Sequence, residues 1–275
     1  MERGYSLSAE ALLYSVVLKK KAGIFGVKNV LSGMDEGAYA DFARKAEEEL
    51  EACGAAELDF GEGISLTEEF DGLMDLCTDC AGVVAVDLRN EKDQKHMTFY
   101  LGSEQVPVLV TEGEGYRLYP SAQAMELLRG FLKLPEGRFN FADFRIESRN
   151  AAGTKEQDLA ARGMDQEGAK FLAEVLNGGN SFCEVSRIEG FEKEEFLPFA
   201  YSDKGCAEVR VDYDADREYF VFRAVDGEEL LGRIEQMLKE EMLTSFDENE
   251  HEGIEYLPEE LERIERDQEL EEEGE

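Results

Sequence analysis

The pattern of hydrophobic and polar positions predicts the same series of elements twice along the chain. In the first unit, a helix over 66–79 is followed by four strands and a closing helix. In the second unit, a helix over 165–177 is again followed by four strands and a closing helix. The predicted strands are 83–90, 96–102, 105–111 and 115–119 in the first unit and 182–188, 195–201, 206–213 and 217–224 in the second, and the closing helices are 121–132 and 227–241. Repetition on this scale predicts two related halves.

The repeat predicts an α+β fold with two pseudo-symmetric halves, each an antiparallel sheet packed against helices, as two sheets or as one shared sheet. The closing segments agree best, "YRLYPSAQAMELLRGFLK" against "YFVFRAVDGEELLGRIEQMLK". Short polar connections predict hairpin turns. They lie at 112–115, 203–205 and 214–216.

Helix-capping residues predict further helices before the first unit. Ser8 is placed to cap a helix that runs to about Lys20, and a second helix should run from about Asp35 to Cys53 and end at Gly54. Ser65 and Glu68 have the spacing of a capping box for the helix over 66–79. The stretch "LDFGEGIS" before it is predicted to be a plain connection.

These elements predict an N-terminal half over 1–146, a connector over 147–164, a C-terminal half over 165–246 and an acidic tail over 247–275. The segment "RFNFADFRI" (138–146) is too apolar for a linker, and it can either cross over to the other sheet or pack beneath it. The tail holds fifteen acidic residues and two arginines, so we expect it to be partly disordered and dispensable for folding.

The overall charge narrows the class of partner. With 64 acidic and 29 basic residues, the chain carries −35, which repels nucleic-acid phosphates and anionic membrane surfaces. The apolar run over 11–18 is too short to insert in a membrane, and its lysines follow it, unlike in a signal peptide. Five cysteines, an odd number, fit reduced thiols. We therefore expect a cytoplasmic protein.

The sequence offers no set of residues for catalysis or metal binding. His96 and His251 lack a nucleophile in a suitable context, and the Cys77–Cys80 pair lacks the second pair that a four-sulfur zinc site needs. The run Asp212–Glu218 has no glycine at the sixth position of a calcium loop. We expect no enzyme activity, no cofactor and no bound metal.

Several stretches resemble the EspG family, cytosolic chaperones of type VII (ESX) secretion systems. They are "LSAEALLYSVVL", "AYADFARKAEEELEACGAAE", "GEGYRLYPSAQAMELLRGFL", "DLAARGMDQEGAKFLAEVLNGGNSFCEV" and "REYFVFRAVDGEELLGRIEQML". The resemblance covers most of residues 6–241 and implies two related halves that bind a helical secreted protein or its heterodimer, with the secretion ATPase as a further partner. The absence of tryptophan and the high acidity point to a distant, Firmicutes-type relative, whose cargo would be a WXG-type or LXG-type export.

One asymmetry between the two units predicts a partner-binding site. Between its first two strands the second unit has "EGFEKEEFLPF", with Phe191, Phe196 and Leu197 among charges, where the first unit has only the polar "NEKDQK". We predict that these three residues bind the partner, and the alternative is that they fold back as core. An alternative function for the whole chain is an acidic immunity protein that neutralises a basic toxin.

Overall fold

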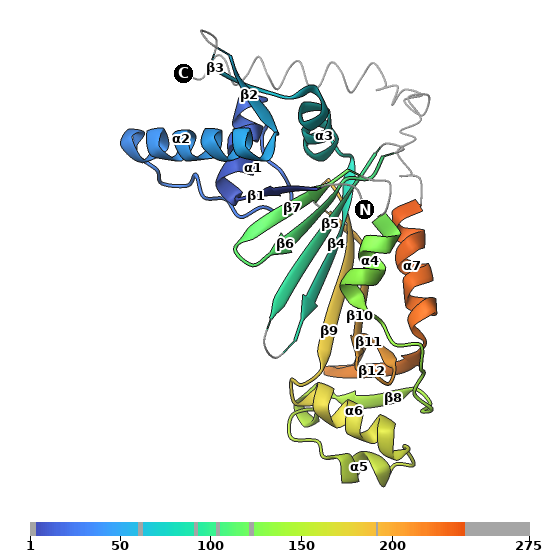
Figure 1. Ribbon diagram of the computed structural model, residues 1–275. Helices are drawn as coiled ribbons and strands as arrows, with labels where there is room; N and C mark the ends of the chain where they lie inside the picture. The colour runs from blue at the N-terminus through green and yellow to red at the C-terminus, as the bar shows by residue number, and fades with distance from the viewer. Residues whose placement is uncertain are drawn as a thin grey trace, which may run out of the picture. The chain divides into compact units, whose positions relative to one another are not determined.

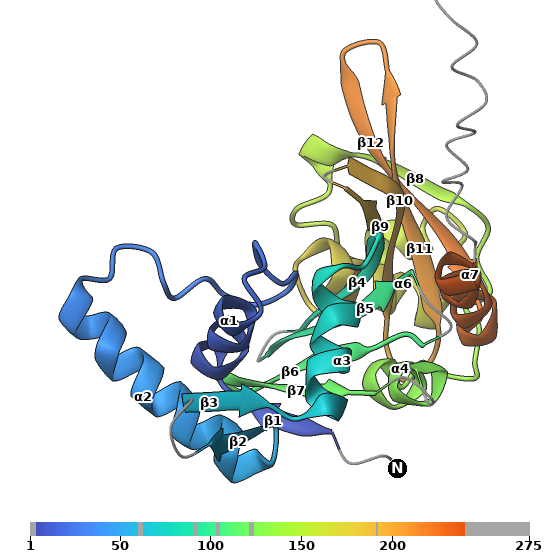
Figure 2. The ribbon, with the colours of Figure 1, turned by 90° about the horizontal axis from the view of Figure 1, so that it is seen from above.

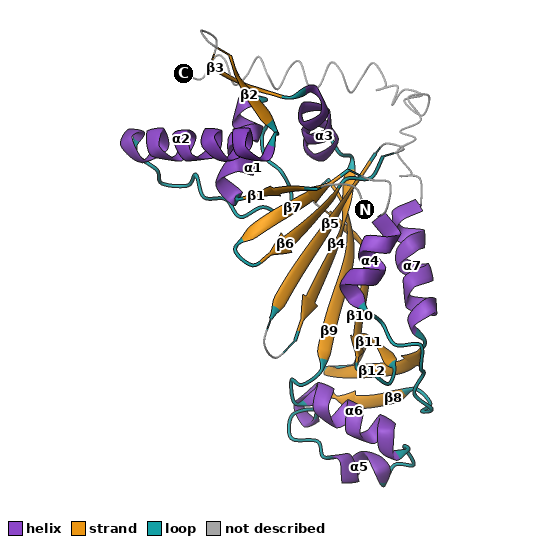
Figure 3. Ribbon diagram, viewed as in Figure 1, coloured by secondary structure: helices purple, strands orange, loops and turns teal. Residues whose placement is uncertain are grey.

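A computed structural model describes residues 4–59, 63–90, 93–102, 105–120, 124–190 and 192–239. The described residues form an α+β fold built on one ten-stranded antiparallel sheet, in the order β1-β7-β6-β5-β4-β9-β10-β11-β12-β8 (Figure 1). Helices cover both faces of this sheet, as Figure 3 shows by type of element. The sequence left open whether the two halves form two sheets or share one, and in the described residues they share the ten-stranded sheet.

Each half contributes a four-stranded meander to the sheet. The strands are β4 (Gly82–Arg89), β5 (Gln94–Leu101), β6 (Val108–Glu112) and β7 (Gly115–Tyr119) in the first half, and β9 (Ser181–Glu189), β10 (Glu192–Tyr201), β11 (Cys206–Asp214) and β12 (Arg217–Val225) in the second. The two meanders join where β4 pairs antiparallel with β9, from Gly82 opposite Glu189 to Arg89 opposite Phe182. The strand order is therefore the same outward from the centre on both sides, as a pseudo-twofold arrangement requires.

The repeat extends to the helices and to the edge strands. Each meander follows one helix and precedes another: α3 (Glu68–Thr78) and α4 (Ala124–Leu132) in the first half, α6 (Gln166–Leu176) and α7 (Gly227–Lys239) in the second. At the outer edges β1 (Tyr5–Leu7) pairs with β7, and β8 (Phe144–Glu147) pairs with β12. The apolar segment over 138–146 thus crosses to the sheet of the second half.

Helix ends in the first half follow local capping. Ser8 accepts a hydrogen bond from the Ala11 amide at the start of α1 (Ala9–Leu18), and α2 (Glu36–Cys53) ends at Gly54, whose φ of 77° is left-handed. The left-handed position favours glycine, which has no Cβ to clash.

The capping box predicted at Ser65 is wrong. Ser65 lies within β3 (Gly63–Leu66), which forms a hairpin with β2 (Ala56–Asp59), and Thr67 holds the N-cap position of α3. The stretch predicted as a plain connection is therefore a small second sheet. Pairing within this hairpin prevailed over a capping motif that fits many sequences.

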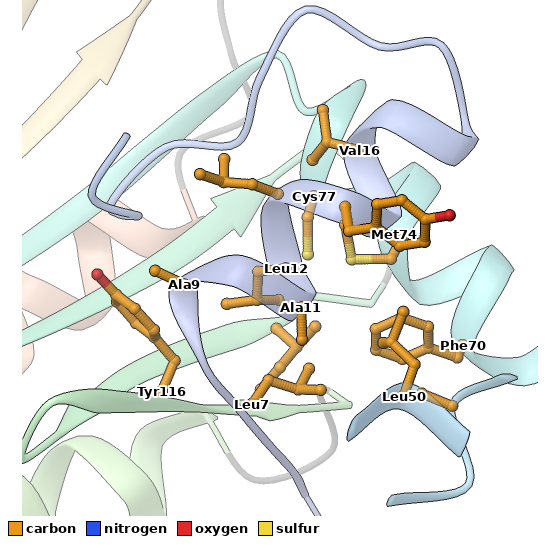
Figure 4. Packing of buried hydrophobic residues seen from close by; sticks show 14 of the residues in the cluster. Leu7, Ala9, Ala11, Leu12, Val16, Leu50, Phe70, Met74, Cys77 and Tyr116 are labelled. Carbon is orange, nitrogen blue, oxygen red and sulfur yellow. The ribbon is translucent and has the colours of Figure 1, made fainter. Parts of the chain in front are cut away.

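Three apolar clusters form the core. On one face of the sheet, α4 and α7 lie side by side and pack against residues of the central strands. On the other face, α1, α2 and α3 pack over the β1–β7 end (Figure 4), while α6 and α5 (Glu156–Ala160) pack over the β12–β8 end. The short helices η1 (Ser148–Asn150) and α5 lie within the segment expected to be a connector. Residues up to Lys239 form one compact unit, and the tail predicted over 247–275 lies outside the described residues.

Candidate functional site

The face of the sheet opposite α4 and α7 is the candidate binding surface, and we call its central part, on β5, β4, β9 and β10, the open face. It lies between the helices that pack over the two ends of the sheet (Figure 1). One row across it consists of Phe196, Ser186, Ala85 and Thr98, which are direct neighbours in four successive strands. Ser186, Ala85 and Thr98 are small and buried, whereas the Phe196 side chain is 49% exposed. An exposed aromatic side chain next to small, buried neighbours is the kind of residue that commonly anchors a binding partner.

The next row carries polar and charged side chains. In the strand register, Asp87 lies opposite Glu184 of β9 on one side and opposite His96 of β5 on the other. His96 Nδ1 lies 2.8 Å from Asp87 Oδ1, and its Nε2 lies 2.9 Å from Thr98 Oγ1. Because a carboxylate only accepts, Nδ1 carries the proton that is donated to Asp87. This hydrogen bond from His96 lowers the pKa of Asp87 below its usual value, so the open face keeps a negative charge here.

The long loop between α1 and α2 forms one border of the open face. Tyr100 Oη donates to the Phe25 carbonyl at 2.7 Å, and the Lys28 amide donates to Tyr116 Oη at 3.0 Å. These two hydrogen bonds hold Gly26 directly against Thr98 and His96. The side chain of the preceding residue, Phe25, is 41% exposed. Ordered loops of this length are commonly functional.

Phe25 was not predicted from the sequence. The available signal was "GIFGV", two glycines around an apolar pair in a loop too long for a simple connection. Only the tertiary contact with β5 brings it to the open face.

The structure separates the three predicted partner-binding residues. The stretch that holds them is mostly strand, because β10 begins at Glu192 directly after a turn at Gly190. Phe196 is exposed on the open face, while Leu197 is only 2% exposed and packs in the core with α7. Phe191 lies outside the described residues. Their role in binding stays a prediction, which Phe196 is best placed to carry.

A hollow of about 260 Å³ lies between β10 and α7, on the side of the sheet away from the open face. Its lining residues are Glu195, Phe196, Leu197, Arg233, Gln236 and Met237. Lys193 Nζ lies 3.7 Å from the centre of the Phe196 ring, which is a cation–π distance. The hollow therefore combines an apolar wall with charged side chains.

A larger hollow lies at the opposite end of β9 and β10. It has a volume of about 700 Å³, and its lining includes Asn90, Lys133, Glu174, Ser181 and Tyr201. The side chains there are mostly polar and of mixed charge, and the aromatic residue among them, Tyr201, is only 8% exposed. We therefore place the candidate site at Phe196.

Two of the thiols are held in their protonated form by burial. Burial raises the pKa of Cys206 to about 12 and that of Cys77 well above its usual value, so both thiols stay protonated. The described residues contain no group of three or more His, Cys, Asp or Glu side chains placed to hold a metal ion. Of the helices within the described ranges, none has the length and apolar character of a membrane span.

The fold and the site define a protein of two related halves on a shared sheet, with one exposed aromatic side chain, Phe196, on the open face. The fold is similar to that of a solved protein: a structure of the type VII secretion system chaperone EspG5 from Mycobacterium tuberculosis, in complex with a PE25–PPE41 dimer, matches with a TM-score of 0.54. The match covers 86% of this chain and 96% of that chain at 9% sequence identity, so it shows a shared fold. No protein-family model matches the chain, and no curated protein matches its sequence.

Proposed function

We propose that this protein is a cytoplasmic chaperone that binds a helical secreted protein of the WXG or LXG type, or its heterodimer, and keeps it competent for export through a type VII machinery. The observation that carries the proposal is the exposed Phe196, beside a hollow that it helps to line, in a chain whose fold is similar to that of EspG5. The solved EspG5 is in complex with a PE25–PPE41 dimer, which supports a protein partner of this kind here.

The physical basis is shielding of apolar surface. An export that waits in the cytoplasm exposes apolar side chains that would otherwise drive aggregation. Contact with Phe196 and Phe25 covers such side chains, and the charge of −35 keeps the complex soluble and attracts basic partners.

Co-expression with candidate helical exports encoded beside this gene tests the proposal. We expect one export to become soluble and to co-elute with the protein on size exclusion. Phe196→Ser should abolish co-elution without lowering the melting temperature, because the side chain is already half exposed. Tyr39→Ser removes an exposed aromatic from α2 instead, and it should leave the complex intact.

Retained co-elution of a stably folded Phe196→Ser variant would remove Phe196 from the site. If no export binds, the chaperone function itself is wrong. Specific binding of a basic toxin in place of any export would favour the immunity-protein alternative.

A further inference from the structure

The sheet is interrupted between β10 and β11. The two strands pair only at Phe199–Glu208, Ala200–Ala207 and Tyr201–Cys206. Beyond these pairs β10 continues along β9, and β11 continues along β12 to Asp214. Over the described residues, the stretches 192–198 of β10 and 209–214 of β11 thus have no pairing with each other, and we call this gap the β10–β11 split.

Pro198 gives the physical reason for the split. The Ser202 amide donates to the Gly205 carbonyl in the turn between the two strands. Since main-chain groups alternate sides along a strand, the groups of Pro198 also face β11. Proline has no N–H to offer, so the ladder loses a rung directly beyond Phe199.

The same alternation leaves the main chain of β11 open beyond this point. Counted from Gly205, the N–H and C=O groups of Val211 and Tyr213 face the split, while those of Asp212 face β12. Figure 2 shows the β11–β12 ribbon projecting away from the other strands. Val211 is 47% exposed and Tyr213 is 74% exposed.

The two borders of the split differ in how they are protected. β10 carries a bulge between Lys193 and Glu195 as well as Pro198, two features that keep an edge strand from pairing. β11 has neither a proline nor a register shift along its pairing with β12. An unprotected edge is a template for one more strand.

The chemistry on the α7 side of the split favours a basic strand. Exposed acidic side chains outnumber exposed basic ones here: Glu192, Glu195, Asp212 and Asp214 against Arg210 and Arg217, the last of which lies opposite Asp214. Lys193 lies over the Phe196 ring, and Arg233 Nη1 is held 3.0 Å from Glu208 Oε2. The hollow of about 260 Å³ opens at this place, with Leu197 and Met237 as apolar wall and Glu195 beside them. It suits a lysine, whose methylene stem packs on apolar surface while its ammonium reaches a carboxylate.

We propose that the β10–β11 split binds an extended, lysine-rich segment of a partner protein, which adds to β11 as a further strand. Its alternate side chains would be lysines on the α7 side and apolar residues on the open face, against Phe196, Val211 and Tyr213. Main-chain bonds supply the affinity in this mode of recognition, and the side chains supply the specificity. The inference goes beyond the proposed function, because docking of a strand does not depend on a helical export.

The test uses the full chain and a labelled probe peptide, acetyl-Lys-Thr-Lys-Leu-Lys-Val-Lys-amide, with fluorescence anisotropy as the readout. We expect saturable binding that weakens as salt is raised. A peptide with glutamate in place of each lysine should not bind. A peptide with proline in place of leucine should bind at least about tenfold more weakly, because it loses a main-chain donor.

Matched variants of the protein locate the site. Val211→Pro removes an N–H that the pairing with β12 does not use, and it should weaken binding at least about tenfold. Val211→Thr keeps both the N–H and the β-branched shape, and it should bind like the wild type. Amide exchange at Val211 and Tyr213 should slow when the peptide is added.

Three results would overturn the inference. They are absence of binding by the lysine peptide, equal binding by the Val211→Pro and Val211→Thr variants, and equal binding by the leucine and proline peptides. The last comparison needs no variant protein, so it holds even if Val211→Pro does not fold. Self-association through this edge without peptide would also overturn it, because the occupant would then be a second copy.

Discussion

Replacing Gly26 by alanine tests whether the α1–α2 loop is held against the open face as described. Gly26 has a φ of 79°, and an added Cβ would lie 2.6 Å from Thr98 Oγ1 and 3.3 Å from His96 Nε2. Gly33 of the same loop has a φ of 82° and no atom within 4 Å of an added Cβ. Gly33→Ala is therefore a matched control that carries the backbone strain without the clash.

The expected difference follows from the contacts. The left-handed conformation costs alanine about 1–2 kcal/mol at either position. At Gly26 the buried Thr98 cannot yield freely, and overpacking adds about 1–3 kcal/mol. If the loop lifts instead, it loses the bonds of Tyr100 and Lys28, at about 1 kcal/mol each. Both routes give Gly26→Ala a further loss of about 2 kcal/mol beyond Gly33→Ala.

Urea unfolding measures this difference in the free energy of unfolding. The melting temperature of Gly26→Ala should lie about 4–8 °C below that of Gly33→Ala for a protein of this size. If the loop lifts, exchange of the Lys28 amide should accelerate in Gly26→Ala and not in Gly33→Ala, because the hydrogen bond to Tyr116 Oη is then lost. The double variant Gly26→Ala with Thr98→Ala should recover part of the loss, since the clashing Oγ1 is gone. Equal losses at the two glycines would refute the described packing of the loop.

Two further changes probe charged groups. Glu208→Gln should lower the free energy of unfolding by about 2 kcal/mol, because the buried carboxylate forms ion pairs with both Arg223 and Arg233. Glu235→Gln, in the exposed ion pair with Lys239, should change the free energy of unfolding by less than about 0.5 kcal/mol. Equal effects of the two variants in urea unfolding would contradict this. Asp87 has a lowered pKa in the folded protein, so its contribution to stability is present above its unfolded pKa of about 3.9 and is lost as the pH falls through the folded value. The stability gap between wild type and Asp87→Asn should therefore shrink below about pH 4, and a gap that stays constant in urea unfolding from pH 6 to pH 3 would argue against the His96–Asp87 bond.

Local patterns were enough to predict most of the elements. The periods of hydrophobic positions gave the four strands and two helices of each half, because burial on one face imposes a period of two or of 3.6 on neighbouring residues. The cap at Ser8 and the end of α2 at Gly54 are likewise fixed within one turn of chain. Repetition of these elements was sufficient to predict the pseudo-symmetric α+β fold.

The tertiary structure decided everything that joins distant segments. Pairing of β4 with β9 made one sheet of two halves, and pairing of β8 with β12 placed a segment that the pattern left open. Phe196 and Leu197 are neighbours in sequence, yet strand geometry puts one on the open face and the other in the core. Phe25 and the β10–β11 split also escaped prediction. Contacts between residues far apart in sequence leave no period in the chain, so local pattern can name the elements but cannot say which of their surfaces meet.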